Sequence, residues 1–156
     1  MTVVVWITEG SWPACVDAAR AHTADGADVV LLHVTGHDVP GVAHGAYAGL
    51  LGRGHPERDP GTRLESLADA SARELLRAAA ERLGRPCRSV ERTGRTGHEV
   101  VAAAEGAALL VLARDGDRGR PGPKSLGPAA RFVVDHAPCP VLLVWPEPVP
   151  GASPPH

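Results

Sequence analysis

The chain has 156 residues and a mass of 16.2 kDa, a length that fits one domain with its own core. Hydrophobic residues make up 44% of the sequence but aromatic residues only 3%, so Val, Leu and Ala must supply most of that core. The formal net charge of -2 and the isoelectric point near 6.4 give no basic field, which argues against stable binding to nucleic acid.

The cysteines and the start of the chain bear on the cellular compartment. Cys15, Cys87 and Cys139 are far apart and form no CxxC pair, as expected of small buried residues in a reducing cytoplasm. The apolar run at residues 3–7 is too short to cross a membrane and lacks the charged start of a signal peptide. We therefore expect a cytoplasmic protein without a membrane partner.

The first part of the chain predicts a strand, a helix and a second strand. Residues 3–7 are mostly β-branched and precede a turn, which indicates a central strand. Ser11 is expected to cap the helix that follows, with Pro13 in its first turn. Residues 29–34 form a second apolar run after Gly26. A strand, helix and strand in this order predict a right-handed crossover and a parallel sheet.

The next segment, residues 35–61, differs in composition from the rest of the chain. It holds seven Gly, three Pro and three His and far exceeds the ~4–6 residues usual for a connection, so it is either functional or mobile. Residues 42–51 form a candidate short helix within it. Thr62 and Glu65 then predict a capping box for a long amphipathic helix that ends at Gly84.

A third strand and a third helix are predicted next. Residues 87–91 indicate the strand, although its pattern is weak. Thr96 and Glu99 repeat the capping-box pattern, and Gly106 ends the short helix that they begin.

Two further apolar runs, residues 109–113 and 141–144, have the length of strands that are covered on both faces. A helix is expected to start near Gly127 between them. The Pro-rich tail at residues 146–156 predicts an irregular extension outside the core. No internal repeat is visible, so residues 1–145 are expected to form one α/β domain.

The loop between these last two strands carries the main chemical hypothesis. Seven of the sixteen residues from Ala113 to Pro128 are Gly or Pro. A strand that leads through a Gly-rich loop into a helix offers free backbone N–H groups, and the helix dipole favours an anion there. The loop carries a charge of +2, from Arg114, Arg118, Arg120 and Lys124 against Asp115 and Asp117.

Residues 109–144 resemble the C-terminal half of the universal stress protein family, and HAPCPV at residues 136–141 is especially similar to the stretch before that family's last strand. The resemblance covers nearly the whole chain in the order of its elements. It implies a doubly wound, five-stranded parallel sheet, Rossmann-like or flavodoxin-like, in the order 3-2-1-4-5 with helices on both faces. The carboxyl ends of strands 1 and 4 then meet at the topological switch point, where open α/β sheets bind ligands.

The family's nucleotide-binding members carry Gly-x2-Gly-x9-Gly-Ser/Thr in this loop, and the chain keeps part of that motif. Ala113 replaces the first Gly. Gly116 and Gly127 keep the second and third, with ten residues between them rather than nine. Pro128 replaces the Ser or Thr and supplies neither a hydroxyl nor an N–H group, so the donor geometry is impaired although the charge of the loop still permits an anion.

The resemblance also implies residues outside this loop. Glu9 stands where the family usually has an Asp that contacts the nucleotide. Val34 matches an apolar residue that lines the adenine pocket, and the alternative is that it is an ordinary strand residue. The implied site for ATP or another adenine nucleotide comprises Thr8, Glu9, Gly10, Val34, Ala113, Arg114, Gly116, Gly127, Pro128 and Ala129.

Other kinds of site have less support in the sequence. Four histidines lie within one region, but no spacing among them defines a metal site and no Cys joins them, so we expect no metal: His33, His37, His44 and His55. The chain has no Gly-x-Ser-x-Gly elbow of a hydrolase. No general base or nucleophile can be named near the loop, so we expect no catalytic activity beyond weak ATP hydrolysis.

Two functions remain open. The first is a stress-response regulator whose occupancy by an adenine nucleotide alters its shape or its partners. The second is an interaction module of the same family that binds no nucleotide and acts through its dimer surface. Adenylyl transfer is disfavoured because the chain lacks the HIGH, KMSKS and Ser-Gly-Gly-x-Asp-Ser motifs.

The last strand predicts a homodimer. Residues 141–144 are apolar and uncharged, and an edge strand of this kind exposes unpaired N–H and C=O groups. The resemblance implies that the strand pairs with its twofold mate in a second copy, antiparallel, as a self-complementary contact. The alternative is that the tail from Pro146 covers this edge within a monomer. Any other protein partner is unknown.

Overall fold

The structure is a computed structural model that describes residues 1–36, 60–116 and 123–146. Strands and helices alternate along these residues. In chain order the elements are β1 (Thr2–Trp6), α1 (Trp12–His22), β2 (Asp28–Gly36), α3 (Pro60–Leu83), β3 (Cys87–Gly94), α4 (Thr96–Ala103), β4 (Leu109–Ala113), the 3-10 helix η2 (Pro123–Ser125), α5 (Pro128–His136) and β5 (Val141–Val144).

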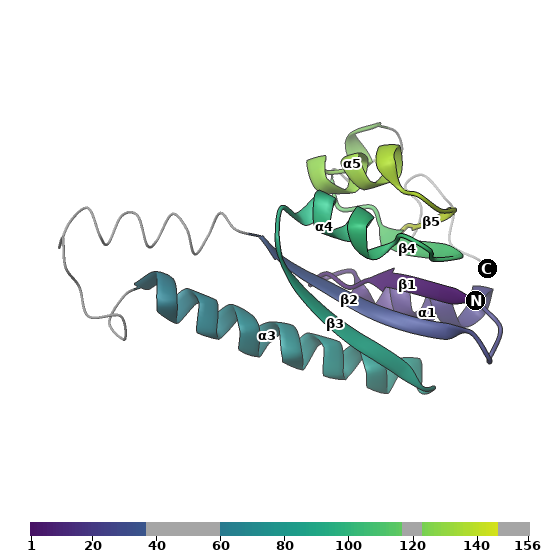
Figure 1. Ribbon diagram of the computed structural model, residues 1–156, viewed down its shortest axis with the longest axis horizontal. Coiled ribbons are helices and arrows are strands. Elements are labelled where there is room, and N and C mark those ends of the chain that lie inside the picture. The colour runs from purple at the N-terminus through teal and green to yellow at the C-terminus, as the bar shows by residue number, and fades with distance from the viewer. Residues whose placement is uncertain (37–59, 117–122, 147–156) are drawn as a thin grey trace, which may run out of the picture.

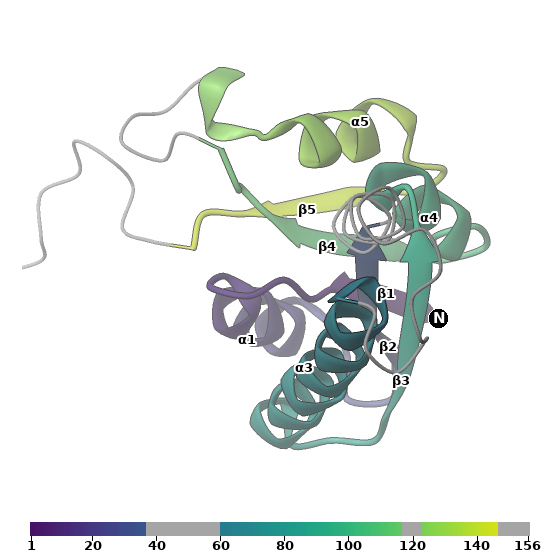
Figure 2. The same ribbon diagram turned by 90° about the vertical axis from the view of Figure 1, so that its left-hand side faces the viewer.

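The strands form one parallel sheet in the order β3-β2-β1-β4-β5, which confirms the doubly wound fold and the strand order that the resemblance implied. Helices α1 and α3 cover one face of the sheet, and α4 and α5 cover the other (Figure 1). Figure 2 shows α1 and α3 together on one side of the strands and α5 on the opposite side. The chain therefore changes face between the neighbouring strands β1 and β4, and this is the switch point.

Alternation along the strands divides the core into two layers, because successive side chains of a strand point to opposite faces. On β1 and β2, Val3 and Leu31 belong to the layer under α1 and α3, whereas Val4 and Leu32 belong to the layer under α4 and α5. All four are at most 2% exposed. The same alternation decides which side chains at the end of β2 can reach a site on either face.

Both predicted capping boxes are wrong. Helix α3 begins at Pro60, so Thr62 lies inside the first turn rather than before it. Proline suits the first helical position because its missing N–H would have no partner there and its φ is already helical. Helix α4 begins at Thr96 itself, and the residue before it makes no side-chain capping bond. Glu99 accepts a hydrogen bond from Arg92 Nη1 at 3.2 Å instead.

Ser11 precedes α1 as predicted, but its hydroxyl is not a cap. It pairs with the hydroxyl of Thr8, and no side-chain capping bond is formed. The turn before α1 is therefore stabilised by a hydrogen bond between two of its own side chains.

The third strand is longer than predicted, because it pairs with β2 along its whole length, from Cys87 opposite Val29 to Gly94 opposite Gly36. It is an edge strand with partly exposed side chains, so its pairing does not require an apolar pattern. Most of the predicted 35–61 connection, including the candidate helix at residues 42–51, lies outside the described residues. No helix in the described part of the chain is long and apolar enough to span a membrane.

Candidate functional site

The turn between β1 and α1 is held by its own hydrogen bonds. Trp12 N–H donates to the Thr8 carbonyl at 3.0 Å, and the hydroxyls of Thr8 and Ser11 pair across the turn. Gly10 has a φ of +86°, a left-handed conformation that favours glycine. The side chain of Glu9, within this turn, is exposed at the carboxyl end of β1.

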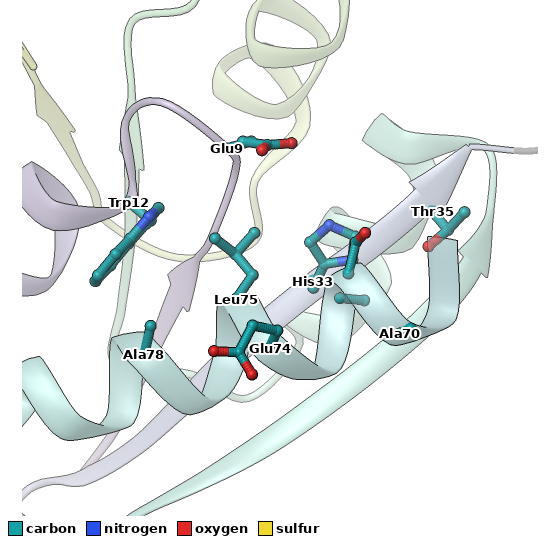
Figure 3. A pocket seen from close by; sticks show the side chains of 10 residues that line it. Glu9, Trp12, His33, Thr35, Ala70, Glu74, Leu75 and Ala78 are labelled. Atoms are coloured by element: carbon teal, nitrogen blue, oxygen red, sulfur yellow. The ribbon is translucent and has the colours of Figure 1, made fainter. Parts of the chain in front are cut away.

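A cavity of about 650 Å³ lies beside this turn (Figure 3). Its volume is within the range of small-molecule sites, roughly 300–1,000 Å³. Glu9 and Trp12 contribute one wall, and His33 and Thr35 from the end of β2 contribute a second. The remaining wall is a face of α3, formed by Ala70, Ser71, Ala72, Glu74, Leu75 and Ala78.

His33 is the one polar side chain of this cavity with a buried, unsatisfied atom among the residues that the structure describes. Its Nδ1 is buried and has no hydrogen-bond partner there. Burial lowers the pKa of His33 below 6.5, and this effect exceeds that of the carboxylates of Glu91 and Glu9, which act in the opposite direction. The ring is therefore neutral at pH 7 and offers one donor and one acceptor. Because buried polar atoms are rarely left unpaired, Nδ1 is available for a hydrogen bond with a group of a bound ligand.

Val34 lies in the opposite layer from this cavity. It packs in the cluster under α4 and α5 and is 8% exposed. The alternation of β2 places His33 and Thr35 at the cavity instead. Neither residue was predicted as part of a nucleotide site, although the period of two along a strand places them on the face that Val34 does not share.

The described part of the β4–α5 loop is closed by hydrogen bonds within the chain. Gly116 N–H donates to the Ser125 carbonyl at 2.9 Å. Gly127 N–H donates to Asp115 Oδ1 at 2.6 Å. The two glycines that keep the motif thus use their N–H groups internally.

Close contact within the loop explains why these two positions are glycine. A Cβ on Gly116 would lie 2.5 Å from the carbonyl oxygen of Lys124, and a Cβ on Gly127 would lie 2.9 Å from Asp115 Oδ1. Position 116 has no room for a side chain because the contacting atoms belong to the backbone, whereas at position 127 the exposed Asp115 carboxylate would have to move. Glycine at these two positions therefore has a structural explanation that does not require a ligand.

The remaining predicted residues of this loop have distinct surroundings. Ala113 is 7% exposed and packs in the layer under α1 and α3. The Arg114 guanidinium donates to the Ser125 hydroxyl and lies 4.9 Å from the ring centroid of Trp145. Arg114 is thus engaged with the loop and with the residue after β5.

Helix α5 begins as predicted, with Gly127 before it and Pro128 at its first position. Pro128 has no N–H group to donate. The N–H group of Ala129 lies in the first turn, where a helix provides no internal acceptor. Ala129 is therefore the first residue of α5 that can donate to an anion.

Strands β1 and β4 are neighbours, with Val3 opposite Leu109, so the turn at residues 8–11 and the loop after β4 leave the same edge of the sheet. The structure thus brings all the predicted residues except Val34 to the carboxyl ends of two adjacent strands. Within the described ranges no group of three or more His, Cys, Asp or Glu could hold a metal ion. His37, His44 and His55 lie outside those ranges.

The Universal stress protein family model matches residues 1–144, and the chain belongs to this family. The match confirms the resemblance drawn from residues 109–144. No curated protein matches the chain.

Solved structures are similar to the chain over almost its whole length. Hypothetical protein MJ0577, whose structure served a structure-based assignment of biochemical function, has 18% identity and a TM-score of 0.67, covering 92% of this chain and 95% of its own. Universal stress protein UspA from Lactobacillus plantarum has 20% identity and a TM-score of 0.63, covering 92% and 97%. A universal stress protein in complex with cAMP has 20% identity and a TM-score of 0.58, covering 94% and 98%. At these identities the likeness shows the fold.

Proposed function

We propose that the chain is a stress-response regulator that binds an adenine nucleotide, with weakened affinity, at the carboxyl edge of the sheet. The observation that carries this proposal is the cavity of about 650 Å³ with an aromatic ring, Trp12, and an unpartnered buried atom, His33 Nδ1, in its walls. A structure similar to this one is described as a complex with cAMP, an adenine nucleotide.

The chemistry of the cavity suits a nucleoside. The indole of Trp12 offers a flat surface for a base, and aromatic contacts of this kind contribute ~0.5–1.5 kcal/mol beyond burial of area. His33 Nδ1 offers a hydrogen bond to the polar edge of the base. The exposed carboxylate of Glu9 can accept hydrogen bonds from ribose hydroxyls at the rim.

The phosphates would extend toward the β4–α5 loop and the N-terminus of α5, where the helix dipole favours an anion. Support for this half of the site is weaker. Gly116 and Gly127 donate within the loop, and Pro128 has no N–H group, so Ala129 supplies the first donor. These same observations favour the second candidate function, an interaction module that binds no nucleotide.

The proposal includes a homodimer formed through β5. This strand pairs with β4 along one edge, and no further strand of the described residues pairs with its other edge. All four residues of β5 are partly exposed. Antiparallel pairing with the same strand of a second copy satisfies both edges with one contact. Nucleotide occupancy at the switch point would then act on an assembly rather than on a single chain.

Titration calorimetry with adenosine, AMP and ATP tests the nucleotide site. Ala70→Trp fills the cavity from α3 and should abolish binding of all three ligands. Arg73→Trp places the same ring on an exposed position of α3 that does not line the cavity, and it should leave adenosine binding unchanged. Absence of heat at millimolar concentrations of every ligand would contradict the proposal and support the interaction module. Equal binding by the two variants would place the ligand elsewhere.

A further inference from the structure

We infer that the Asp115 carboxylate occupies the position before α5 where a phosphate would bind. The site consequently binds an uncharged nucleoside in preference to a nucleoside triphosphate. This inference rests on the proposed function and specifies its ligand class.

Asp115 supplies the charge that the start of α5 lacks. Gly127 is the residue before α5, in an extended conformation with φ of -72° and ψ of 173°, and it has no side chain with which to cap the helix. Its N–H group donates to Asp115 Oδ1 at 2.6 Å, a short hydrogen bond of the kind that charged acceptors make. A carboxylate at this place has the same favourable interaction with the helix dipole that a phosphate would have.

Gly127 is also fitted to this carboxylate. A Cβ at position 127 would lie 2.9 Å from Asp115 Oδ1 and 3.2 Å from its carboxyl carbon. The absence of a side chain therefore lets the carboxyl group lie directly over the helix start. A phosphate that approached the same N–H group would need the same space.

Among the N–H groups of the loop and helix start that the structure describes, Ala129 is the first that remains for a phosphate. Gly116 N–H donates to the Ser125 carbonyl at 2.9 Å, and Ser125 is fully buried. Pro128 has none. A polyphosphate that used the N–H groups of Gly127 or Ala129 would therefore have to displace the Asp115 carboxylate or lie beside it, with like charges close together.

The Asp115 carboxylate does not obstruct the part of the site that would bind the nucleoside. Trp12 and His33 line a cavity on the α1 and α3 face, whereas α5 packs on the other face. Asp115 is exposed, so its carboxylate can move into water when a phosphate approaches. The preference for adenosine over a phosphorylated ligand should therefore increase with the number of negative charges on that ligand.

Calorimetric titrations of adenosine and ATP into the wild-type protein and Asp115→Asn test the inference. The substitution removes the charge but keeps an oxygen that can accept from Gly127. We expect the wild type to bind adenosine more tightly than ATP. Asp115→Asn should increase the affinity for ATP about tenfold and change the affinity for adenosine less than twofold. Asp115→Glu keeps the charge and should retain the wild-type preference.

Asp135→Asn is the matched control, because it removes an exposed carboxylate from the other end of α5. It should leave both affinities unchanged. An ATP affinity that is the same or lower in Asp115→Asn would overturn the inference. If adenosine and ATP bind the wild type equally, the inference fails and the proposed function stands. If neither ligand binds any of these proteins, the proposed function itself fails.

Discussion

Gly97 lies directly against the ring of Phe132 where α4 meets α5. A Cβ at position 97 would be 2.7 Å from Phe132 Cδ1. The ring is itself stacked between His98 and His136, with centroid separations of 4.3 Å and 4.1 Å, which restricts its movement. The contact of the two helices therefore depends on the absence of a side chain at position 97.

Gly97→Ala is expected to destabilise the protein by about 1–3 kcal/mol, the usual cost of overpacking. The direction of this change in stability is informative, since Gly→Ala within a helix ordinarily stabilises a protein by about 0.5–1 kcal/mol. Urea denaturation measures the difference. The control is Gly26→Ala, where an added Cβ has no atom within 4 Å and where stability should change little. Equal stability of the two variants would show that Phe132 can move aside.

The pH dependence of stability should report on His33. Burial lowers the pKa of this residue in the folded protein below 6.5, so the unfolded chain binds the proton more tightly. The free energy of unfolding should therefore fall as the pH decreases from about 6.5 through the lowered pKa of the folded state. His33→Gln should reduce the difference in unfolding free energy between pH 7.5 and pH 5.5.

His22→Gln serves as the control for this measurement, because His22 is exposed at the end of α1 and the variant keeps His33. It should retain the wild-type difference between the two pH values. An undiminished difference in His33→Gln would assign the pH dependence to other groups.

The sequence predicted the order of strands and helices well because buried parallel strands are apolar throughout. The runs ending in Ile7, Val34, Ala113 and Val144 stand out for that reason. The order of strands in space came from the family resemblance, since periodicity along one chain carries no information on which strands are neighbours.

The candidate site was predicted less completely, for two physical reasons. Val34 was carried over from a family pattern, whereas the alternation of β2 places His33 and Thr35 at the cavity. The contact between Asp115 and Gly127 spans a loop, and a Gly- and Pro-rich sequence does not determine how such a loop folds on itself.

The predicted helix starts were also wrong in two places. Helix α3 begins earlier, at Pro60, and Glu99 accepts a hydrogen bond from Arg92 in place of the predicted capping contact.

The proposed dimer predicts that Leu143→Lys yields a monomer, because the twofold axis would bring two lysines together within an apolar contact. Light scattering measures the mass, and circular dichroism verifies that the variant is folded. An unchanged dimer mass in a folded variant would rule out this interface.

Val141→Pro provides a second test that leaves the β4–β5 ladder intact. The carbonyls of Pro140 and Val144 accept hydrogen bonds from Leu110 and Arg114, so the backbone groups of residues 141 and 143 point away from β4. Proline is tolerated where an edge strand presents its N–H group outward. The variant should fold and lose the pairing between copies.

The proposed function requires that an adenine nucleoside binds at the carboxyl ends of β1 and β2, in the cavity beside Trp12. Titration of adenosine into ¹⁵N-labelled protein, followed by ¹H–¹⁵N correlation spectra, locates the bound ligand residue by residue. Binding in this cavity should shift the signals of the Trp12 indole N–H and of the Glu9 and Thr35 amides. The signal of the Trp6 indole, which is 4% exposed and lies in the other layer, should not change. Shifts confined to the amino ends of the strands, near Asp28, or no shifts at millimolar adenosine, would contradict binding in this cavity.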